Sequence, residues 1–128
     1  MAGLLRRKPS GKFMGMDALV LTTLGRRSGV ERSVPVVWFP GGHGTYLIAA
    51  SAAGAARNPA WFHNLAVNPD KARIDIDGRT LSVNAEQLHG TERDRAWHQI
   101  ITTAPRFAGY QQKTDREIPV IRLTPRAG

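Results

Sequence analysis

Apolar and β-branched residues gather in short stretches that are separated by glycine- and proline-containing turns, a pattern typical of β-strands. Polar and apolar positions alternate on both sides of Asp77-Gly78, which is a hairpin signal. The pattern predicts six strands, at residues 16–24, 31–39, 46–50, 73–76, 80–85 and 118–123. Pro119 favours an edge position for the start of the last strand, because proline has no amide hydrogen to donate.

Two segments have the pattern of short helices. Asn58 and Pro59 are typical of a helix start and predict a helix at 59–67. A capping-box pattern begins at Thr91, and apolar residues then recur at helical spacing until Pro105. About six mostly antiparallel strands with two or three short helices predict a β-rich α+β domain or barrel.

The length of 128 residues, with 41% hydrophobic and 22% charged residues, is typical of one globular domain. We expect a flexible basic N-terminal arm at residues 1–15 and a single domain at 16–125. The absence of cysteine excludes disulfides, a thiolate nucleophile and cysteine-ligated metals. No apolar run reaches the ~20 residues of a membrane span, and the first residues do not form a signal peptide. We therefore expect a cytoplasmic protein.

Charge is the unusual part of the composition, because 18 basic and 10 acidic residues give a net charge of +8. Residues 1–32 hold seven basic and two acidic residues, so the excess is concentrated there, at +5. Such a surplus favours an anionic partner: nucleic acid, acidic lipid or a small anionic ligand. Basic residues in nucleic-acid binders are commonly interleaved with aromatic ones, but this segment has one aromatic residue, Phe13. We therefore expect no nucleic-acid partner.

The sequence lacks the common signatures of self-contained catalysis. It has no dinucleotide-binding glycine motif, phosphate-binding loop, serine-hydrolase elbow or zinc-protease motif. The four histidines show no paired metal-ligand spacing, so no metal site is expected. Basic and aromatic residues without acid–base machinery suit chemistry that a bound cofactor supplies.

A turn between the first two expected strands collects basic groups. Arg26, Arg27 and Ser28 lie in the turn, and Arg32 begins the returning strand. Because arginine binds phosphate through parallel hydrogen bonds, these residues form a candidate anion site. The alternative is a solvated basic hairpin tip.

Two further stretches suggest a pocket for a flat ligand. Residues 49–56 are rich in alanine and leave the backbone uncovered, so that a ring could lie against it. Trp61 and Asn64 share a face of the expected helix and could contact a heterocycle, unless Trp61 is core and Asn64 is surface. Phe107 and Tyr110 are also three residues apart and could form a pocket wall.

In this order the three stretches resemble the deazaflavin (F420)-dependent nitroreductase family, including its F420H2-dependent quinone reductases. The resemblance covers residues 10–125 and rests on motifs at 21–29, 32–35, 49–54, 58–69, 110–111 and 114–116, followed by Ile118-Pro119-Val120. It implies a split β-barrel of the type that binds FMN or F420.

The resemblance also implies roles for individual residues. The cofactor-binding positions are Arg26, Arg27, Ser28, Arg32, Pro35, Ala49, Ala50, Ser51, Arg57, Trp61 and Asn64. Tyr110 and Ser51 correspond to catalytic positions, and Val37, Phe107 and Tyr110 to the acceptor pocket. Val37, Ala104 and Phe107 stand where the nitroreductase has other groups, so this pocket has fewer hydroxyls.

The implied function is an F420H2-dependent oxidoreductase that transfers a hydride to a quinone-like, conjugated carbonyl or nitro acceptor. The expected partners are F420 and a small hydrophobic acceptor, in a monomer or homodimer. The basic N-terminus is a candidate for peripheral contact with the acidic inner face of the cell membrane. Three alternatives stay open: a non-catalytic F420 carrier, a relative that uses FMN, and a basic nucleic-acid-binding module.

Overall fold

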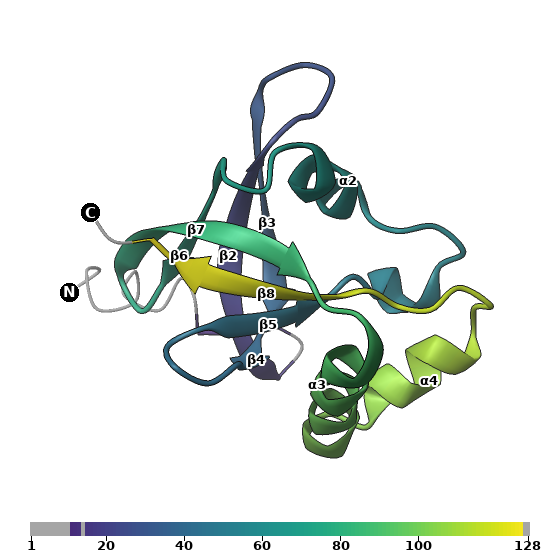
Figure 1. Ribbon diagram of the computed structural model, residues 1–128. Helices are drawn as coiled ribbons and strands as arrows, with labels where there is room; N and C mark the ends of the chain where they lie inside the picture. Colours follow the sequence, from purple (N-terminus) through teal and green to yellow (C-terminus); the bar gives the residue numbers. More distant parts are fainter. Residues whose placement is uncertain (1–10, 14, 127–128) are drawn as a thin grey trace.

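A computed structural model describes residues 11–13 and 15–126, which form an antiparallel sheet with helices at its ends (Figure 1). The strands are β1 (Lys12–Phe13), β2 (Met16–Leu24), β3 (Glu31–Val37), β4 (Phe39–Pro40), β5 (Tyr46–Ala49), β6 (Ala72–Ile76), β7 (Arg79–Gln87) and β8 (Val120–Pro125). The helices are the 3-10 turn η1 (Ala52–Gly54) and the α-helices α2 (Ala60–Val67), α3 (Gly90–Thr103) and α4 (Arg106–Gln112). All six expected strands are present, but the one expected at 31–39 ends at Val37, and Phe39 belongs to β4, which pairs with β5; β1 is a short addition. None of these helices is long and apolar enough to cross a membrane, in the part of the chain that the structure describes.

The strands pair in the order β1-β2-β6-β7-β8-β5-β4. Strand β3 is not part of this path and also pairs with β2. All pairings are antiparallel, and the longest runs from Ala18 opposite Val37 to Leu24 opposite Glu31. The natural twist of the strands curls the sheet into a half-barrel (Figure 1). The β2–β3 hairpin extends beyond the body of the sheet, because β3 pairs with β2 as far as Leu24 while β6 pairs with it only from Val20 to Thr22. The turn of this hairpin lies beside α2 (Figure 1).

Two apolar clusters hold the fold together. The first fills the half-barrel and is covered by α2; it contains Leu19, Leu21, Val36, Ile48, Ala50, Leu65, Ala72, Ile74, Ile76, Val83, Ile121 and Leu123. The second joins α3 and α4 to the sheet; it contains Phe39, Leu47, Leu88, Ala96, Ile100, Ala104, Phe107 and Val120. Burial of these side chains is the main stabilising contribution and fixes the helices on the sheet.

The last strand lies at the centre of the sheet, between β7 and β5. The edge position that Pro119 favours is therefore wrong for β8, which begins one residue after it. The carbonyl of Pro119 accepts a hydrogen bond from the amide of Ala50 at 2.9 Å. Proline is tolerated here because its missing amide is not needed, while its carbonyl still continues the pairing with the end of β5.

Two helix starts differ from the sequence prediction. The residue before α2 is Pro59 rather than Asn58, and α3 begins at Gly90 with His89 before it, without a side-chain cap at either start. Asn58 does not cap α2 because its side-chain oxygen accepts a hydrogen bond from Arg116 instead. Of the expected N-terminal arm, residues 1–10 and 14 lie outside the described residues, and Lys12–Phe13 pairs with β2.

Candidate functional site

The turn between β2 and β3 is closed by its own hydrogen bonds. The amide of Gly25 donates to the carbonyl of Val30 at 2.8 Å, and the amide of Gly29 donates to the carbonyl of Gly25 at 2.9 Å. The Ser28 hydroxyl accepts from the amide of Val30 at 3.1 Å. A Cβ at Gly25 would lie 2.7 Å from the Ser28 hydroxyl, so glycine allows this tight turn. The turn thus has a defined shape from which its arginines project.

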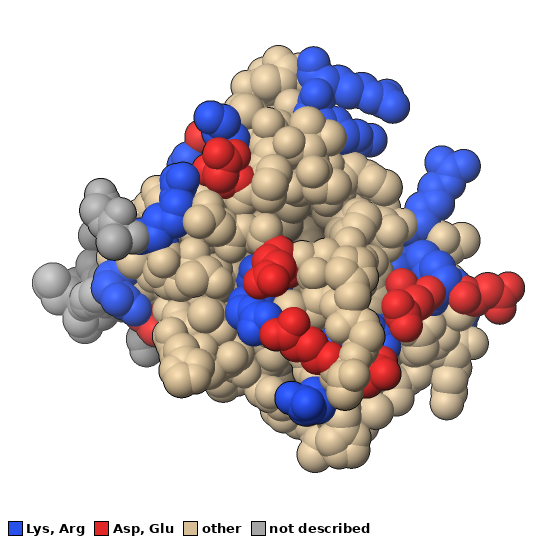
Figure 2. Space-filling model, in the orientation of Figure 1, with Lys and Arg blue, Asp and Glu red and all other residues tan. Residues whose placement is uncertain are grey.

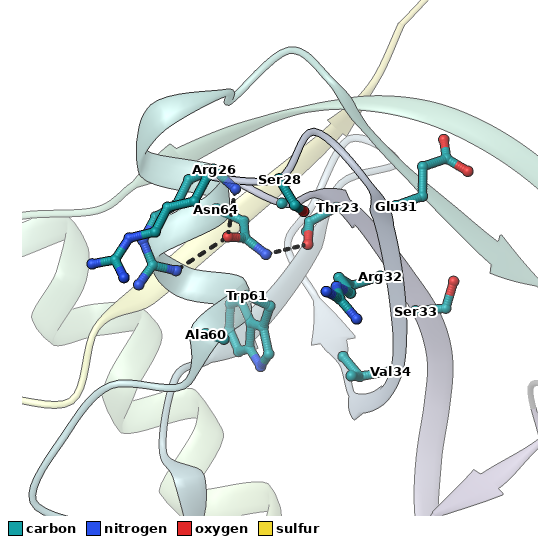
Figure 3. Close-up of a pocket in the computed structure, with 12 residues that line it drawn as sticks. Thr23, Arg26, Ser28, Glu31, Arg32, Ser33, Val34, Ala60, Trp61 and Asn64 are labelled. Carbon is teal, nitrogen blue, oxygen red and sulfur yellow. Dashed lines mark hydrogen bonds between the residues drawn. The ribbon is translucent and has the colours of Figure 1, made fainter.

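A cleft of about 750 Å³ lies between this turn and α2 (Figure 3). It is lined by Thr23, Gly25, Arg26, Arg27, Ser28, Glu31, Arg32, Ser33, Val34, Ala60, Trp61 and Asn64. Basic side chains project from the tip of the hairpin at the top of Figure 2. The cleft therefore brings together the arginines of the turn and the helix residues at 61 and 64 that the sequence singles out.

Strand alternation separates the charges of β3. Arg32 and Val34 lie on the same side as Trp61, whereas Glu31 and Ser33 point away from it (Figure 3). Glu31 receives two hydrogen bonds from Arg73, at 2.5 and 3.0 Å, and these hold the pKa of the Glu31 carboxyl below its usual value. Arg27 and Arg32 form no ion pair with any described residue. The interior of the cleft is consequently cationic.

Asn64 connects helix α2 to the basic turn. It is buried, and its side-chain oxygen accepts hydrogen bonds from the backbone amide and the Nη1 of Arg26, at 3.1 and 3.3 Å. Its side-chain amide donates to the hydroxyl of Thr23, which is also buried, at 3.0 Å (Figure 3). Its polar atoms are thus already bonded to the protein, which makes Asn64 a support of the turn.

A second, smaller pocket of about 260 Å³ adjoins the cleft at Trp61, which lines both. Its lining is mostly apolar and comprises Phe13, Met16, Pro35, Val36, Val37, Ala49, Ser51, Ala52, Ala53, Pro59, Trp61, Phe107 and Tyr110. The rings of Phe107 and Tyr110 meet edge to face with centroids 5.2 Å apart, so α4 forms one wall. This shape suits a flat, conjugated molecule.

The segment after β5 forms another wall of this second pocket. Ser51 has helical backbone angles, whereas Ala52 and Ala53 have positive φ values of 46° and 55°. The hydroxyl of Ser51 makes no hydrogen bond with another described residue. Together with the Tyr110 hydroxyl, it supplies polar atoms to an otherwise apolar pocket.

The structure brings most of the sequence-predicted residues to these two adjoining hollows. Arg57 and Ala50 line neither, because Arg57 is exposed and Ala50 is buried in the core. Sequence reasoning did not assign Phe13 or Met16 to the pocket: Phe13 lies in β1, which is too short to leave a periodic signal, and Met16 is the first residue of β2. Among the described residues, no three His, Cys, Asp or Glu side chains form a group that could hold a metal ion.

Comparison with known proteins gives consistent results. A family model described as F420H(2)-dependent quinone reductase matches residues 5–125. An F420H(2)-dependent quinone reductase of Mycobacterium tuberculosis is 37% identical over 113 residues, which cover 85% of this chain and 74% of that protein.

Solved structures agree with the sequence matches. An F420-H2 dependent reductase has a TM-score of 0.74 and 34% identity, covering 83% of this chain and 92% of its own. A structure described as a domain-swapped dimer has a TM-score of 0.76 and 30% identity, and the match covers 95% of this chain and 94% of that one. The likeness confirms the expected β-rich α+β fold of the split-barrel type.

Proposed function

The chain belongs to the F420H(2)-dependent quinone reductase family and is an F420H2-dependent oxidoreductase, and we propose that the cleft and the adjoining pocket together form its active site. The observation that carries this proposal is the junction at Trp61, where a cationic cleft meets an apolar pocket. A coenzyme with an anionic chain and a flat ring requires both environments side by side.

The residues of the cleft fit the anionic part of F420. Arg27 and Arg32 have no carboxylate partner among the described residues, and Arg26 is held in place by Asn64. Unpaired guanidinium groups at the rim of a concave site are suited to phosphate and carboxylate groups. We assign the phosphate of the coenzyme to Arg26, Arg27, Ser28 and Arg32.

The apolar pocket fits the ring and the acceptor. Bound F420H2 supplies a hydride equivalent. The protein contributes a water-poor pocket, walled by Trp61, Phe107 and Val37, that holds a flat acceptor against the ring. The hydroxyl of Tyr110 donates the proton that completes reduction of the acceptor oxygen, and the hydroxyl of Ser51 orients the acceptor or the ring. The substrate class is a quinone or another conjugated carbonyl or nitro compound.

The pocket beside the cleft favours catalysis over a carrier function. A carrier needs only the coenzyme site, whereas a reductase also needs space for an acceptor next to the ring. Titration of the protein with F420 and with FMN, followed by fluorescence quenching, separates the two cofactors. Oxidation of F420H2 by menadione then separates a reductase, which turns over, from a carrier, which does not.

The phosphate assignment is tested with Arg27→Ala and Arg32→Ala. Each is expected to raise the Kd for F420 about tenfold, since a hydrogen bond to a charged group contributes about 1.5 kcal/mol or more. Turnover at saturating coenzyme stays near the wild-type value, because neither residue lines the second pocket. Arg79→Ala removes the same charge from β7 and serves as the control. An unchanged Kd in both cleft variants would contradict the assignment.

A further inference from the structure

Arg116 lies between α4 and β8 and binds the connection between β5 and α2. Its Nη1 donates to the carbonyl of Ala50 at 3.1 Å and to the side-chain oxygen of Asn58 at 2.6 Å. Its Nη2 donates to the carbonyl of Ser51 at 2.9 Å, and its Nε to the carbonyl of Ala55 at 3.0 Å. A single side chain thus makes four hydrogen bonds to an irregular segment that forms one wall of the second pocket.

The backbone of Arg116 is itself held against α4. The side-chain amide of Gln111 donates to the Arg116 carbonyl at 2.7 Å, and its oxygen accepts from the amide of Ile118 at 3.0 Å. The amide of Arg116 donates to the hydroxyl of Thr114 at 3.4 Å. Because α4 also carries Tyr110, these contacts fix the two walls of the pocket relative to each other.

The hydrogen bonds of Arg116 also set the direction of two amides. In a trans peptide the carbonyl and the following N–H point in opposite directions, and no described peptide bond is cis. The carbonyls of Ala50 and Ser51 face Arg116, and the Ser51 carbonyl also accepts from the amide of Gly54 at 2.8 Å, so the N–H groups of Ser51 and Ala52 face away from Arg116. Neither N–H donates a hydrogen bond to another described residue, and both residues line the pocket.

The charge of Arg116 is not neutralised by a neighbouring carboxylate among the described residues. Its four acceptors are all neutral, and neither Asp115 nor Glu117 forms an ion pair with it. Burial lowers the pKa of Arg116, but an arginine stays protonated at neutral pH. A hydrogen bond from a charged donor polarises the peptide and strengthens its N–H as a donor.

We propose that Arg116 is a positioning residue for the reduction step. It orients the N–H groups of Ser51 and Ala52 toward the acceptor oxygen that becomes negative on hydride transfer, and its charge strengthens both donors. The proposal rests on the proposed function, because it needs the acceptor to lie in the second pocket. A positioning residue differs from a purely structural one, whose loss would affect folding but not the rate of the folded enzyme.

The test uses Arg116→Ala and Arg116→Lys, with Arg122→Ala as the control. Arg122 is a partly buried arginine on the neighbouring strand β8, where it pairs with Glu86 and Glu92, away from both hollows. Three quantities are measured: the Kd for F420 by fluorescence, kcat with menadione, and amide hydrogen exchange of residues 50–58 in the protein without coenzyme.

Arg116→Ala is expected to lower kcat about 100-fold, the size of effect seen when one preorganised donor is lost. The Kd for F420 changes less than threefold, because Arg116 itself lines neither hollow and the arginines of the phosphate site are in the cleft. Exchange at residues 50–58 accelerates, and millimolar guanidinium ion restores part of kcat. Arg116→Lys keeps the charge but cannot reach four acceptors, so its kcat lies between those of Arg116→Ala and the wild type.

If Arg116→Ala shows faster exchange with a wild-type kcat and no effect of guanidinium, the role of Arg116 is purely structural and the inference is overturned. If Arg116→Ala does not fold, Arg116→Lys decides: a lowered kcat with unchanged Kd for F420 supports the inference, and a wild-type kcat overturns it. Failure of the wild-type protein to oxidise F420H2 would instead contradict the proposed function, so the two failures are distinguishable.

Discussion

The contacts of Asn64 show how one buried amide connects a helix to a basic turn. A buried polar side chain is stabilising only when its hydrogen-bonding groups have partners, and here both the oxygen and the amide of Asn64 are bonded. Because the partners are on β2 and on the turn after it, Asn64 determines where Arg26 stands relative to α2. The shape of the cleft therefore depends on a residue that need not touch the ligand.

Asn64→Ala is expected to lower the free energy of unfolding by about 2–3 kcal/mol, because it leaves the Thr23 hydroxyl buried without this partner. It is also expected to raise the Kd for F420, since Arg26 loses its anchor. Urea unfolding measures the first effect and fluorescence titration the second. Asn84→Ala, on an exposed position of β7, is the control and should change neither. A stable variant with wild-type affinity would contradict the supporting role.

The hydroxyl of Tyr110 allows a direct test of proton donation. Tyr110→Phe keeps the ring that packs on Phe107 and removes only the hydroxyl, so kcat with menadione should fall at least about tenfold while the Kd for F420 stays constant. The chain has one other tyrosine, Tyr46, which packs edge to face on Trp38 outside the pocket lining. Tyr46→Phe is therefore a matched control. Unaltered turnover in Tyr110→Phe would exclude the residue as the proton donor.

At the scale of elements, the second pocket depends on how closely η1 approaches α4. Gly54 lies at this contact with φ of +85°, and a Cβ there would lie 2.9 Å from both the Tyr110 carbonyl and the Lys113 Cβ. Backbone atoms of α4 cannot move away without displacing the wall that carries Phe107 and Tyr110. Glycine is thus needed here both for its backbone angle and for its lack of a side chain.

Gly54→Ala is expected to destabilise the protein by more than 2 kcal/mol, combining about 1–2 kcal/mol for the positive φ with the cost of the clash. Gly78→Ala provides the comparison, because Gly78 has a similar φ of +77° and nothing within 4 Å of its added Cβ. The difference between the two variants, measured by thermal or urea unfolding, isolates the clash. Equal losses of stability in Gly54→Ala and Gly78→Ala would mean that η1 and α4 can separate without a cost in free energy.

The sequence predicted the elements better than the contacts between them. Strand alternation and the Asp77-Gly78 turn are local signals, so the strands and the β6–β7 hairpin followed from the sequence. Asn58 was predicted to cap α2, but it bonds to Arg116, which is 58 residues away. Pro119 was predicted to mark an edge, but pairing on both sides of β8 depends on β5 and β7. Such long-range partners leave no periodic signal in the sequence.

The candidate site was predictable where it depends on residue chemistry. Arginines in a short turn indicate an anion site before the fold is known, and the structure brings these residues to one cleft. The sequence did not indicate that the oxygen and the amide of Asn64 would both make internal hydrogen bonds or that Arg57 would lie outside both hollows. The partners of Asn64 are 38 and 41 residues away in the sequence, and such contacts leave no local signal.

At the scale of the whole molecule, ion pairing divides the positive charges into two groups. Lys12, Arg73, Arg93 and Arg122 form ion pairs with carboxylates among the described residues. The arginines of the cleft form none. Other basic residues, such as Arg57 and Arg79, also lack a carboxylate partner among the described residues, but Arg26, Arg27 and Arg32 lie together on the hairpin beside α2, at a concave site (Figure 2). A concave site suits a small polyanion better than the extended surface that a duplex requires.

This distribution predicts how F420 binding depends on salt. Raising NaCl from 50 to 500 mM shortens the Debye length from roughly 13 to 4 Å and should raise the Kd for F420 about tenfold. In the Arg27→Ala/Arg32→Ala double variant the same change should have a smaller effect, because Arg26 is the one arginine of the described cleft lining that remains, whereas Arg79→Ala should keep the full dependence. Fluorescence titration at each salt concentration measures both, and duplex DNA added at low salt should not displace F420. A double variant that keeps the wild-type salt dependence would mean that charges elsewhere on the molecule attract the coenzyme.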